Sequence, residues 1–587
     1  MPDERQQFRV LFRAFLFRAL DLDLLSPGGD MQTLMIQFAA ILAAFNLVVA
    51  YVLVPRYFVS TLPHARLLIY AWSDEEFLIG TTISIVGFLM VLAWDTLLPD
   101  LRDSLVLGLL PIRTRTIALA RASAIGCALG LSVLLVNIFT GFAYAIILTP
   151  PGGGLLVLFR SFAAYWIAMT AAALFTACLL LAVQGIVAQL FSYRVFLQIS
   201  GYIQLTAFFV ILAVYFLKPA LATPAGLTAP QSRIWLKWLP SYWFLGFFQQ
   251  LNGSTHPAFA PLAARAVGAL LTFGLLATIT FALAHRRTIR RIVEQPDISP
   301  ACRSRRGSRL SAIIANSAFH APLNRAVFSF AARTLARSRK HRLLLAMYGG
   351  IGLAIALAYT ESLLHGGWEQ TWNQPNAPLL VASLVVQFFV ILGARIVFAL
   401  PIALPCNWIF RVTAVQSPAA YFAAVRKSLY ALTAFPIWIA SAVFFFAIWP
   451  GRSALQHLCV LVLAGVLIVE KSLNGFRKIP FACSYLPGKA KLNITLGLYA
   501  SLVLFTAHQG GLLEFWAMQG LARYLALIFF LAVAAAWARF RFNAFAAAPF
   551  TSIQFEDRPP GEIFRIDLGH DGEVLGGEVY VGEPGRP

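Results

Sequence analysis

Runs of about 20 apolar residues constrain this chain more than any other feature of its sequence. A helix of that length crosses a hydrocarbon core about 30 Å thick, and about twelve such runs follow one another along the chain. The first six cover residues 31–54, 77–96, 122–148, 162–190, 195–217 and 261–284, and the second six cover residues 343–361, 379–402, 428–449, 455–474, 492–508 and 517–537. With 59% hydrophobic and 12% charged residues, the composition is far from that of a soluble domain. The sequence therefore predicts an all-α integral membrane protein of about twelve transmembrane helices in two six-helix halves.

The basic residues are distributed unevenly between the two sides of these predicted spans. Lys and Arg outnumber Asp and Glu by 46 to 25. If the N-terminus is cytoplasmic, most of the excess falls in inner loops, whereas the outer segments 149–156, 362–378 and 509–516 contain no Lys or Arg. This bias predicts a multi-pass protein of the cytoplasmic (inner) membrane with both termini inside. Topology and membrane lipids account for the charge, so a nucleic-acid partner is not indicated.

Two basic amphipathic segments divide the chain. Residues 1–20 alternate arginines with apolar residues, and a similar pattern begins at Pro322; each is typical of a helix lying along the membrane surface. We therefore expect four regions: a first six-span unit, a basic cytoplasmic linker, a second six-span unit and an acidic cytoplasmic tail. These regions cover residues 1–290, 291–321, 322–545 and 546–587, respectively.

The segment after the second span of each half is repeated. Residues 98–123 and 404–428 both open with Leu-Pro, contain a second proline (Pro111 and Pro418), and close on Ala-x-x-Arg-x-Ser. Recurrence at the same position of both halves favours a duplicated six-span unit.

Two further segments lie outside this repeat. Residues 218–260, between the fifth and sixth spans, carry aromatic residues at helical spacing, which predicts a short helix at the outer interface or one packed on the other spans. The tail alternates apolar and polar residues around Asp571-Gly572, which predicts a β-hairpin.

The first half resembles the membrane subunit of a type-two ABC exporter. That family combines a basic amphipathic helix, six spans, a cytoplasmic coupling helix between spans two and three, and short outer helices between spans five and six. The resemblance is closest at Asp100-Leu-Arg102-Asp103-Ser-Leu-Val-Leu-Gly-Leu-Leu-Pro111-Ile-Arg113. In the second half, Cys406-Asn407-Trp408-Ile409-Phe410-Arg411 replaces the acidic stretch.

The resemblance implies that these segments contact a separate ATP-binding subunit. The residues expected to do so are Asp100, Arg102, Asp103, Leu109, Leu110, Pro111, Arg113, Trp408, Arg411 and Pro418. The chain itself lacks an ATPase motif, because Pro487-Gly488-Lys489-Ala490 departs from the Walker A pattern at two required positions. The six cysteines are scattered and the histidines isolated, so neither a cofactor nor a metal site is expected.

Two other functions remain open from the sequence. A carrier of the major facilitator class would also have six plus six spans, but the signature of that class after the second span is missing. A proton-coupled carrier would also need acidic groups inside the membrane, and no acidic residue stands near the middle of a predicted span. A membrane scaffold or lipid-processing enzyme would need polar groups converging at one membrane face. The sequence offers for this role only the turn-rich segment Lys478–Lys489, with Cys483 and Tyr485.

Overall fold

The protein is an all-helical, multi-pass membrane protein with one small β-hairpin. The computed structural model describes residues 4–20, 31–53, 57, 64–94, 110, 112–148, 154–191, 193–221, 238–294, 320–365, 373–400, 418–474, 476, 480–481, 492–547, 562–568 and 574–581. Within these ranges, nine helical stretches are long and apolar enough to cross a membrane. They are Ala71–Leu92, Arg115–Ile147, Leu155–Leu190, Phe259–Leu283, His341–Thr360, Ala377–Ala399, Pro418–Ile448, Gly451–Ser472 and Leu521–Ala547.

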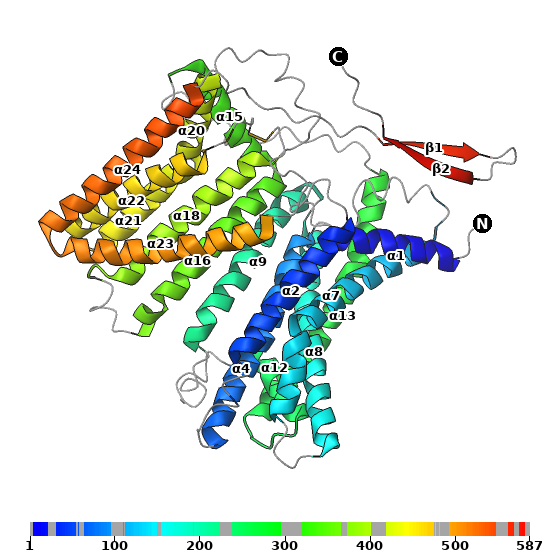
Figure 1. Ribbon diagram of the computed structural model, residues 1–587. Coiled ribbons are helices and arrows are strands. Elements are labelled where there is room, and N and C mark those ends of the chain that lie inside the picture. The colour runs from blue at the N-terminus through cyan, green and yellow to red at the C-terminus, as the bar shows by residue number, and fades with distance from the viewer. Residues whose placement is uncertain are drawn as a thin grey trace. The chain divides into compact units, whose positions relative to one another are not determined.

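The chain forms two compact units, and the first comprises Met1–Arg303 with Leu353–Trp368. Its helices are α1 (Glu4–Leu20), α2 (Met31–Leu53), α4 (His64–Leu92), α7 (Thr114–Leu148), α8 (Leu155–Leu190), α9 (Tyr193–Leu221), α12 (Pro240–Leu251) and α13 (Phe259–Glu294). Within this unit α1 lies across one end of the long helices and the short α12 lies near the other end (Figure 1). Helix α8 packs against α4, α7 and α13.

Helix α12 is the predicted aromatic helix between the fifth and sixth spans. Pro240 stands in its first turn, where a missing N–H costs no hydrogen bond. The helix packs against α4, α8 and α13, and its aromatic side chains Tyr242, Phe244 and Phe248 are almost fully buried. Of the two arrangements left open by the sequence, the structure has the helix packed on the spans.

The second unit comprises Ser304–Gly352 and Glu369–Pro587. Its elements are α15 (Pro322–Arg337), the part of α16 (Arg339–His365) up to Gly352, α18 (Ala377–Ala399), α20 (Pro418–Leu429), η2 (Tyr430–Ala434), α21 (Phe435–Ile448), α22 (Gly451–Ser472), α23 (Leu492–Met518), α24 (Leu521–Ala547), β1 (Glu562–Leu568) and β2 (Val574–Val581). Helix α18 packs against α22 and α23, and α24 packs against both α22 and α23.

One span of the second unit contains a change of helical register. Five residues, Tyr430–Ala434, form a π-helix between α20 and α21. Pro436 follows in the first turn of α21, and a proline has no N–H to donate to the preceding turn. Single π turns inside membrane helices are often found at functional sites.

The tail forms the hairpin that the sequence predicts. Strands β1 and β2 pair antiparallel, with Glu562 opposite Val581 and Asp567 opposite Gly576. The register shifts between Asp567 and Leu568.

Two helix predictions are confirmed and one boundary is wrong. The expected amphipathic helices correspond to α1 and to α15, which begins at Pro322. The second predicted span was expected to begin at residue 77, but α4 begins at His64 and continues without a break through the three acidic residues Asp74, Glu75 and Glu76. Three predicted spans, 31–54, 195–217 and 492–508, fall on α2, α9 and α23, and for these the membrane crossing stays a prediction.

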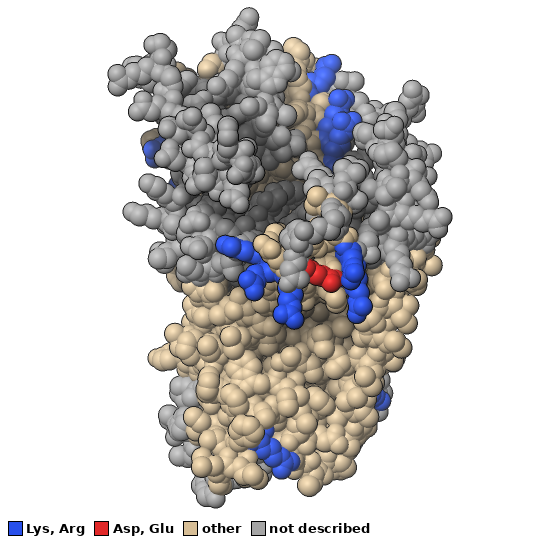
Figure 2. All heavy atoms as spheres, turned by 90° about the vertical axis from the view of Figure 1, so that its right-hand side faces the viewer, with Lys and Arg blue, Asp and Glu red and all other residues tan. Residues whose placement is uncertain are grey.

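The charged side chains are arranged on the surface as expected for a membrane protein. On the face shown in Figure 2, Lys and Arg side chains gather in a band, and the surface below the band is almost free of charge. The exposed basic residues of α1 and of the start of α7 are Arg5, Arg9, Arg13, Arg113 and Arg115. Charged side chains next to an apolar surface are typical of helices at the membrane interface.

Candidate functional site: the helices at the repeated segments

The end of α4, which precedes the first repeated segment, is held by polar side chains of α8 and α9. The last carbonyl groups of a helix have no partner within the helix. Gln184 of α8 donates to the carbonyl of Trp94 at 2.8 Å, and Gln204 of α9 donates to the carbonyl of Val91 at 2.6 Å. The indole of Trp94 in turn donates to Ser200 of α9 at 2.8 Å. All of these side chains are buried, so two helices, α8 and α9, fix the position at which the chain leaves α4.

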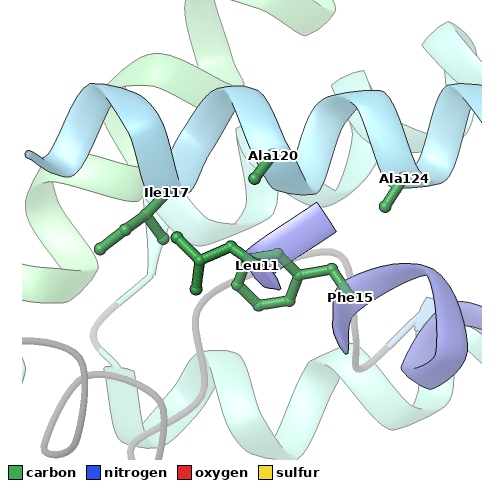
Figure 3. Close-up of a cluster of buried hydrophobic side chains, with 5 residues drawn as sticks. All are labelled: Leu11, Phe15, Ile117, Ala120 and Ala124. Atoms are coloured by element: carbon green, nitrogen blue, oxygen red, sulfur yellow. The ribbon is translucent and has the colours of Figure 1, made fainter. Parts of the chain in front are cut away.

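The start of α7, with which the same segment ends, is held by the amphipathic helix α1. Leu11 and Phe15 of α1 point toward Ile117, Ala120 and Ala124 of α7 and form a buried cluster with them (Figure 3). Burying a Leu or Phe side chain contributes about 1.5–3 kcal/mol. The small alanines allow α1 to approach α7 closely, so the apolar face of α1 serves as its docking surface.

Polar contacts add to this docking. The guanidinium of Arg121 lies 4.7 Å from the ring centre of Phe15, within the range of a cation–π interaction. Thr116 donates to Glu4 at 3.1 Å, and Arg113 lies 3.5 Å from the same carboxyl group. The ion pair is exposed, with 79% and 57% of the two side chains accessible, so it adds little to stability. Arg121 is buried, and we assign it the larger share of the polar contribution.

The second unit anchors the end of α18, which precedes the second repeated segment, with different residues. The Nε2 atom of His341 on α16 lies 3.0 Å from the carbonyl oxygen of Leu400, and the N–H of Phe481 donates to the carbonyl of Phe398 at 2.9 Å. One turn earlier, Arg395 donates to the carbonyl of Ser472 at 2.8 Å and its guanidinium lies over the ring of Phe476.

Helix α20, with which the second repeated segment ends, is held by the second amphipathic helix. Helix α15 packs against α20, and its Phe328 is buried against Ala431 and Leu432 of the π-helix that continues α20. The relation of α15 to α20 therefore repeats the relation of α1 to α7.

A buried ion pair fixes α20 more firmly still. Arg426 lies 3.6 Å from Glu470 of α22, with 7% and 0% of the two side chains accessible. Arg426 also donates to Asn543 of α24 at 2.9 Å, and Tyr430 donates to Glu470 at 3.2 Å. Three helices and the π-helix meet at this pair, so its removal would leave a buried charge uncompensated.

Most of the predicted coupling residues lie outside the described part of the chain. They are Asp100, Arg102, Asp103, Leu109, Pro111, Trp408 and Arg411. Among the others, Leu110 is 47% exposed, Arg113 forms the exposed pair with Glu4, and Pro418 is the half-buried first residue of α20.

A second polar region of the first unit lies on α4. Asp74, Glu75 and Glu76 are buried, whereas the sequence predicts an outer loop at their position. Tyr57 and Tyr144 donate to Asp74 at 2.7 and 3.3 Å, and Gln249 of α12 donates to Glu75. The carboxyl groups therefore join α4 to α7 and to α12.

Two tyrosines in this region remain protonated. Burial, and after it the Asp74 carboxyl group, raises the pKa of Tyr57 above its usual value. Burial and, to a smaller extent, Glu76 raise the pKa of Tyr242 in the same direction. Both hydroxyl groups therefore stay available as hydrogen-bond donors beside the carboxyl groups. In the part of the chain that the structure describes, no three His, Cys, Asp or Glu side chains are arranged to hold a metal ion.

A chain of hydrogen bonds continues from this region toward the middle of the unit. Asn137 of α7 contacts Thr82 of α4 at 3.1 Å and accepts from Tyr165 of α8 at 2.9 Å. Tyr165 also contacts Thr140 at 2.8 Å, and Asn46 of α2 donates to Thr140 at 3.0 Å. Four helices are thus joined by neutral polar groups. In the sequence, the only sign of these hydrogen bonds is the occurrence of asparagines inside apolar runs, as at Asn46 and Asn137.

Comparison with known proteins gives no further guide. No family model matches the chain, and no curated protein or solved structure matches it.

Proposed function

We propose that this protein is the membrane-spanning permease subunit of an ATP-driven exporter, acting with a separate ATP-binding subunit. In this proposal it lies in the cytoplasmic membrane with both termini in the cytoplasm, and its twelve spans form two six-helix halves. The two repeated segments, 98–123 and 404–428, are the contact points for the ATPase.

The observation that carries the proposal is the anchoring at both ends of these segments. A contact that transmits the closure of an ATPase must move together with the membrane helices rather than bend separately from them. In the first unit Gln184 and Gln204 hold the helix before the segment, and α1 holds the helix with which the segment ends. In the second unit His341 and α15 occupy the corresponding places.

The exposed residues within the first segment fit a docking surface. Leu110 exposes 47% of its surface, and Arg113, three residues later, pairs with Glu4 of α1. Arginine is one of the side chains that most often contribute binding energy at interfaces, and here it stands close in sequence to an exposed apolar residue.

The test is retention of an ATPase by the tagged, full-length protein purified from its native membranes. We expect ATPase activity to copurify with the wild type and to fall at least tenfold when Leu109 and Leu110 are both changed to Asp. The matched control is Leu155→Asp, because Leu155 is 85% exposed at the opposite end of the first unit.

Either of two results would refute the proposal. One is that no nucleotide-binding protein accompanies the wild type, and the other is that the Leu109/Leu110 variant retains as much ATPase activity as Leu155→Asp. The folded state of each variant is checked by its thermal unfolding midpoint.

A proton-coupled carrier is the second candidate, and the buried acidic residues of α4 favour it. Glu75 and Glu76 are 1% and 0% exposed inside a helix able to cross the membrane, and such residues often mark ion pathways. This reading predicts that the purified protein dissipates an imposed pH gradient in liposomes without ATP, as followed with a pH-sensitive dye. Glu75→Gln should abolish that flux. If the protein is an exporter permease, neither the wild type nor Glu75→Gln should dissipate the pH gradient.

A further inference from the structure

Three polar side chains from separate helices of the second unit meet in a row. Ser383 lies on α18, His457 on α22 and Glu514 on α23. The Oγ atom of Ser383 lies 2.9 Å from Nε2 of His457, and Nδ1 of His457 lies 2.7 Å from Oε1 of Glu514. Both ring nitrogens of one imidazole therefore have a partner, a hydroxyl on one side and a carboxyl on the other.

The three groups differ in how deeply they are buried. His457 and Glu514 are fully buried, and the rings of Phe445 and Trp449 pack on the imidazole with centroids 4.5 and 5.9 Å away. Ser383 is only half-buried. The imidazole is thus shielded and fixed in orientation, while Ser383 retains some exposed surface.

This geometry is that of an activated nucleophile. A serine becomes nucleophilic when an adjacent base takes its proton, and the base is effective when a third group holds it in the right tautomer and orientation. We propose that Ser383, His457 and Glu514 form a catalytic triad for acyl transfer from an acyl ester whose chain lies in the bilayer. This activity is independent of an ATP-binding subunit.

The position of the triad along the helices defines the substrate class. Ser383 and His457 each lie six residues after the first residue of their helix, which is about 9 Å at 1.5 Å per residue. Glu514 lies four residues before the end of α23. All three therefore lie at one end of the helices, within reach of an ester at the boundary between headgroups and acyl chains.

The reaction needs only the ester and water. The Ser383 hydroxyl has one hydrogen and two acceptors nearby, His457 Nε2 and the Leu380 carbonyl at 2.9 Å. With the hydrogen directed to Nε2, Oγ attacks the ester carbonyl carbon as its proton passes to Nε2. The bond to the alcohol then breaks, and the alcohol leaves with that proton while the acyl group stays on Ser383. Water attacks the acyl group, gives a proton to Nε2 and releases the carboxylic acid; the proton returns to Oγ. Glu514 accepts the Nδ1–H throughout.

A neighbouring contact shows what a purely structural link between the same helices looks like. One turn along α18, Gln387 donates to the carbonyl of Leu461 at 3.0 Å and accepts from Trp438 at 2.8 Å. In that contact all groups are neutral, and both the nitrogen and the oxygen of the Gln387 side chain have a hydrogen-bond partner. In contrast, Oε2 of the buried Glu514 has no hydrogen-bond partner among the described residues, which is costly in an apolar interior. Neutral side chains such as Gln387 are therefore sufficient to connect α18 with α22, and the ionisable groups His457 and Glu514 are not needed for that purpose.

The test uses the purified full-length protein in lipid nanodiscs and an alkyl fluorophosphonate, which reacts covalently with activated serines. We expect mass spectrometry to locate the adduct on Ser383. The adduct should disappear in Ser383→Ala, and the labelling rate should fall by about 1,000-fold or more in His457→Gln and Glu514→Gln. Hydrolysis of a p-nitrophenyl ester of a long-chain fatty acid should fall in parallel.

The internal control is Ser472, which is also half-buried and also donates to a carbonyl of its own helix, that of Val469 at 2.8 Å. It is expected to remain unlabelled. If Ser383 of the folded wild type is labelled no faster than Ser472, or if labelling is unchanged in His457→Gln, the triad is structural and the proposal is overturned. Ser383→Ala removes one oxygen atom, and an unchanged unfolding midpoint verifies that its fold is intact.

Discussion

The two units hold the helices at their repeated segments with chemically different residues. In the first unit the helix before the repeated segment is held by the amides of Gln184 and Gln204, and the unit is joined internally by asparagine, threonine and tyrosine side chains. In the second unit the equivalent places use His341, Arg395 and the buried pair Arg426–Glu470. The two units therefore hold corresponding helix ends, but the first uses neutral amides and the second uses ionisable side chains. Loss of an anchor should therefore be more costly in the second unit.

The largest expected effect is at the buried ion pair of the second unit. Glu470→Ala leaves the Arg426 guanidinium buried beside Phe542 without its carboxylate. We expect a loss of about 3–5 kcal/mol in the free energy of unfolding, measured as a lowered thermal midpoint in detergent. The control is Lys471→Ala, the exposed next residue. Equal midpoints for the two variants would show that the pair contributes no stability.

A smaller effect is expected at the acidic region of the first unit. Gln249→Ala removes the amide that donates to Glu75 and leaves a buried carboxyl oxygen without that donor. The expected cost is about 1–3 kcal/mol, with α12 becoming easier to cleave by protease as it loosens from α4. Gln250 is exposed on the same helix, so Gln250→Ala should change neither measurement. Unchanged proteolysis of the Gln249 variant would contradict the assigned role.

Close helix contacts provide a test in both units. A Cβ atom on Gly246 would meet Leu262, and one on Gly511 would meet Val381, including its backbone nitrogen at 3.0 Å. Gly246→Ala and Gly511→Ala should each cost about 1–3 kcal/mol, measured as lowered unfolding midpoints. The adjacent Gly510 has only Leu384 at 3.8 Å, and Gly510→Ala should be neutral or stabilising by up to about 1 kcal/mol. If Gly510→Ala lowered the unfolding midpoint more than Gly511→Ala, the observed contact between α18 and α23 would be contradicted.

The smallest effect is expected at the exposed ion pair of the first unit. Arg113→Ala removes the partner of Glu4, but both side chains are largely exposed, so the cost should be about 0–1 kcal/mol. It should also disappear at high salt concentration, because exposed charges are screened. A loss as large as that of Glu470→Ala would mean that the two units do not differ in the way described above.

Local patterns allowed much of the helical structure to be predicted from the sequence. The amphipathic helix at Pro322 was predictable because a proline in the first turn and alternating basic and apolar residues are local signals. The start of α4 was misplaced because Asp74, Glu75 and Glu76 look like the polar end of a span when read alone. Their burial depends on Gln249, 174 positions away, and on Tyr144, 70 positions away.

The anchoring residues were predictable only in part. The Ala-x-x-Arg-x-Ser ending of the repeated segments draws attention to Arg426, and this arginine forms the buried ion pair with Glu470. Gln184 and Gln204 gave no signal, because one polar residue in an apolar run does not reveal which carbonyl group it meets. His457 looked isolated because its partners are 74 and 57 positions away.

The sequence by itself determined that this is a helical membrane protein. A long apolar segment can satisfy its own backbone within the bilayer only as a helix, and that requirement depends on local composition alone. The tertiary structure decided which polar groups meet inside it. The hydrogen bonds of Glu75, Glu470 and His457 depend on which helices are neighbours and on how each is rotated, since a polar side chain is stable in the interior only opposite a complementary one from another helix.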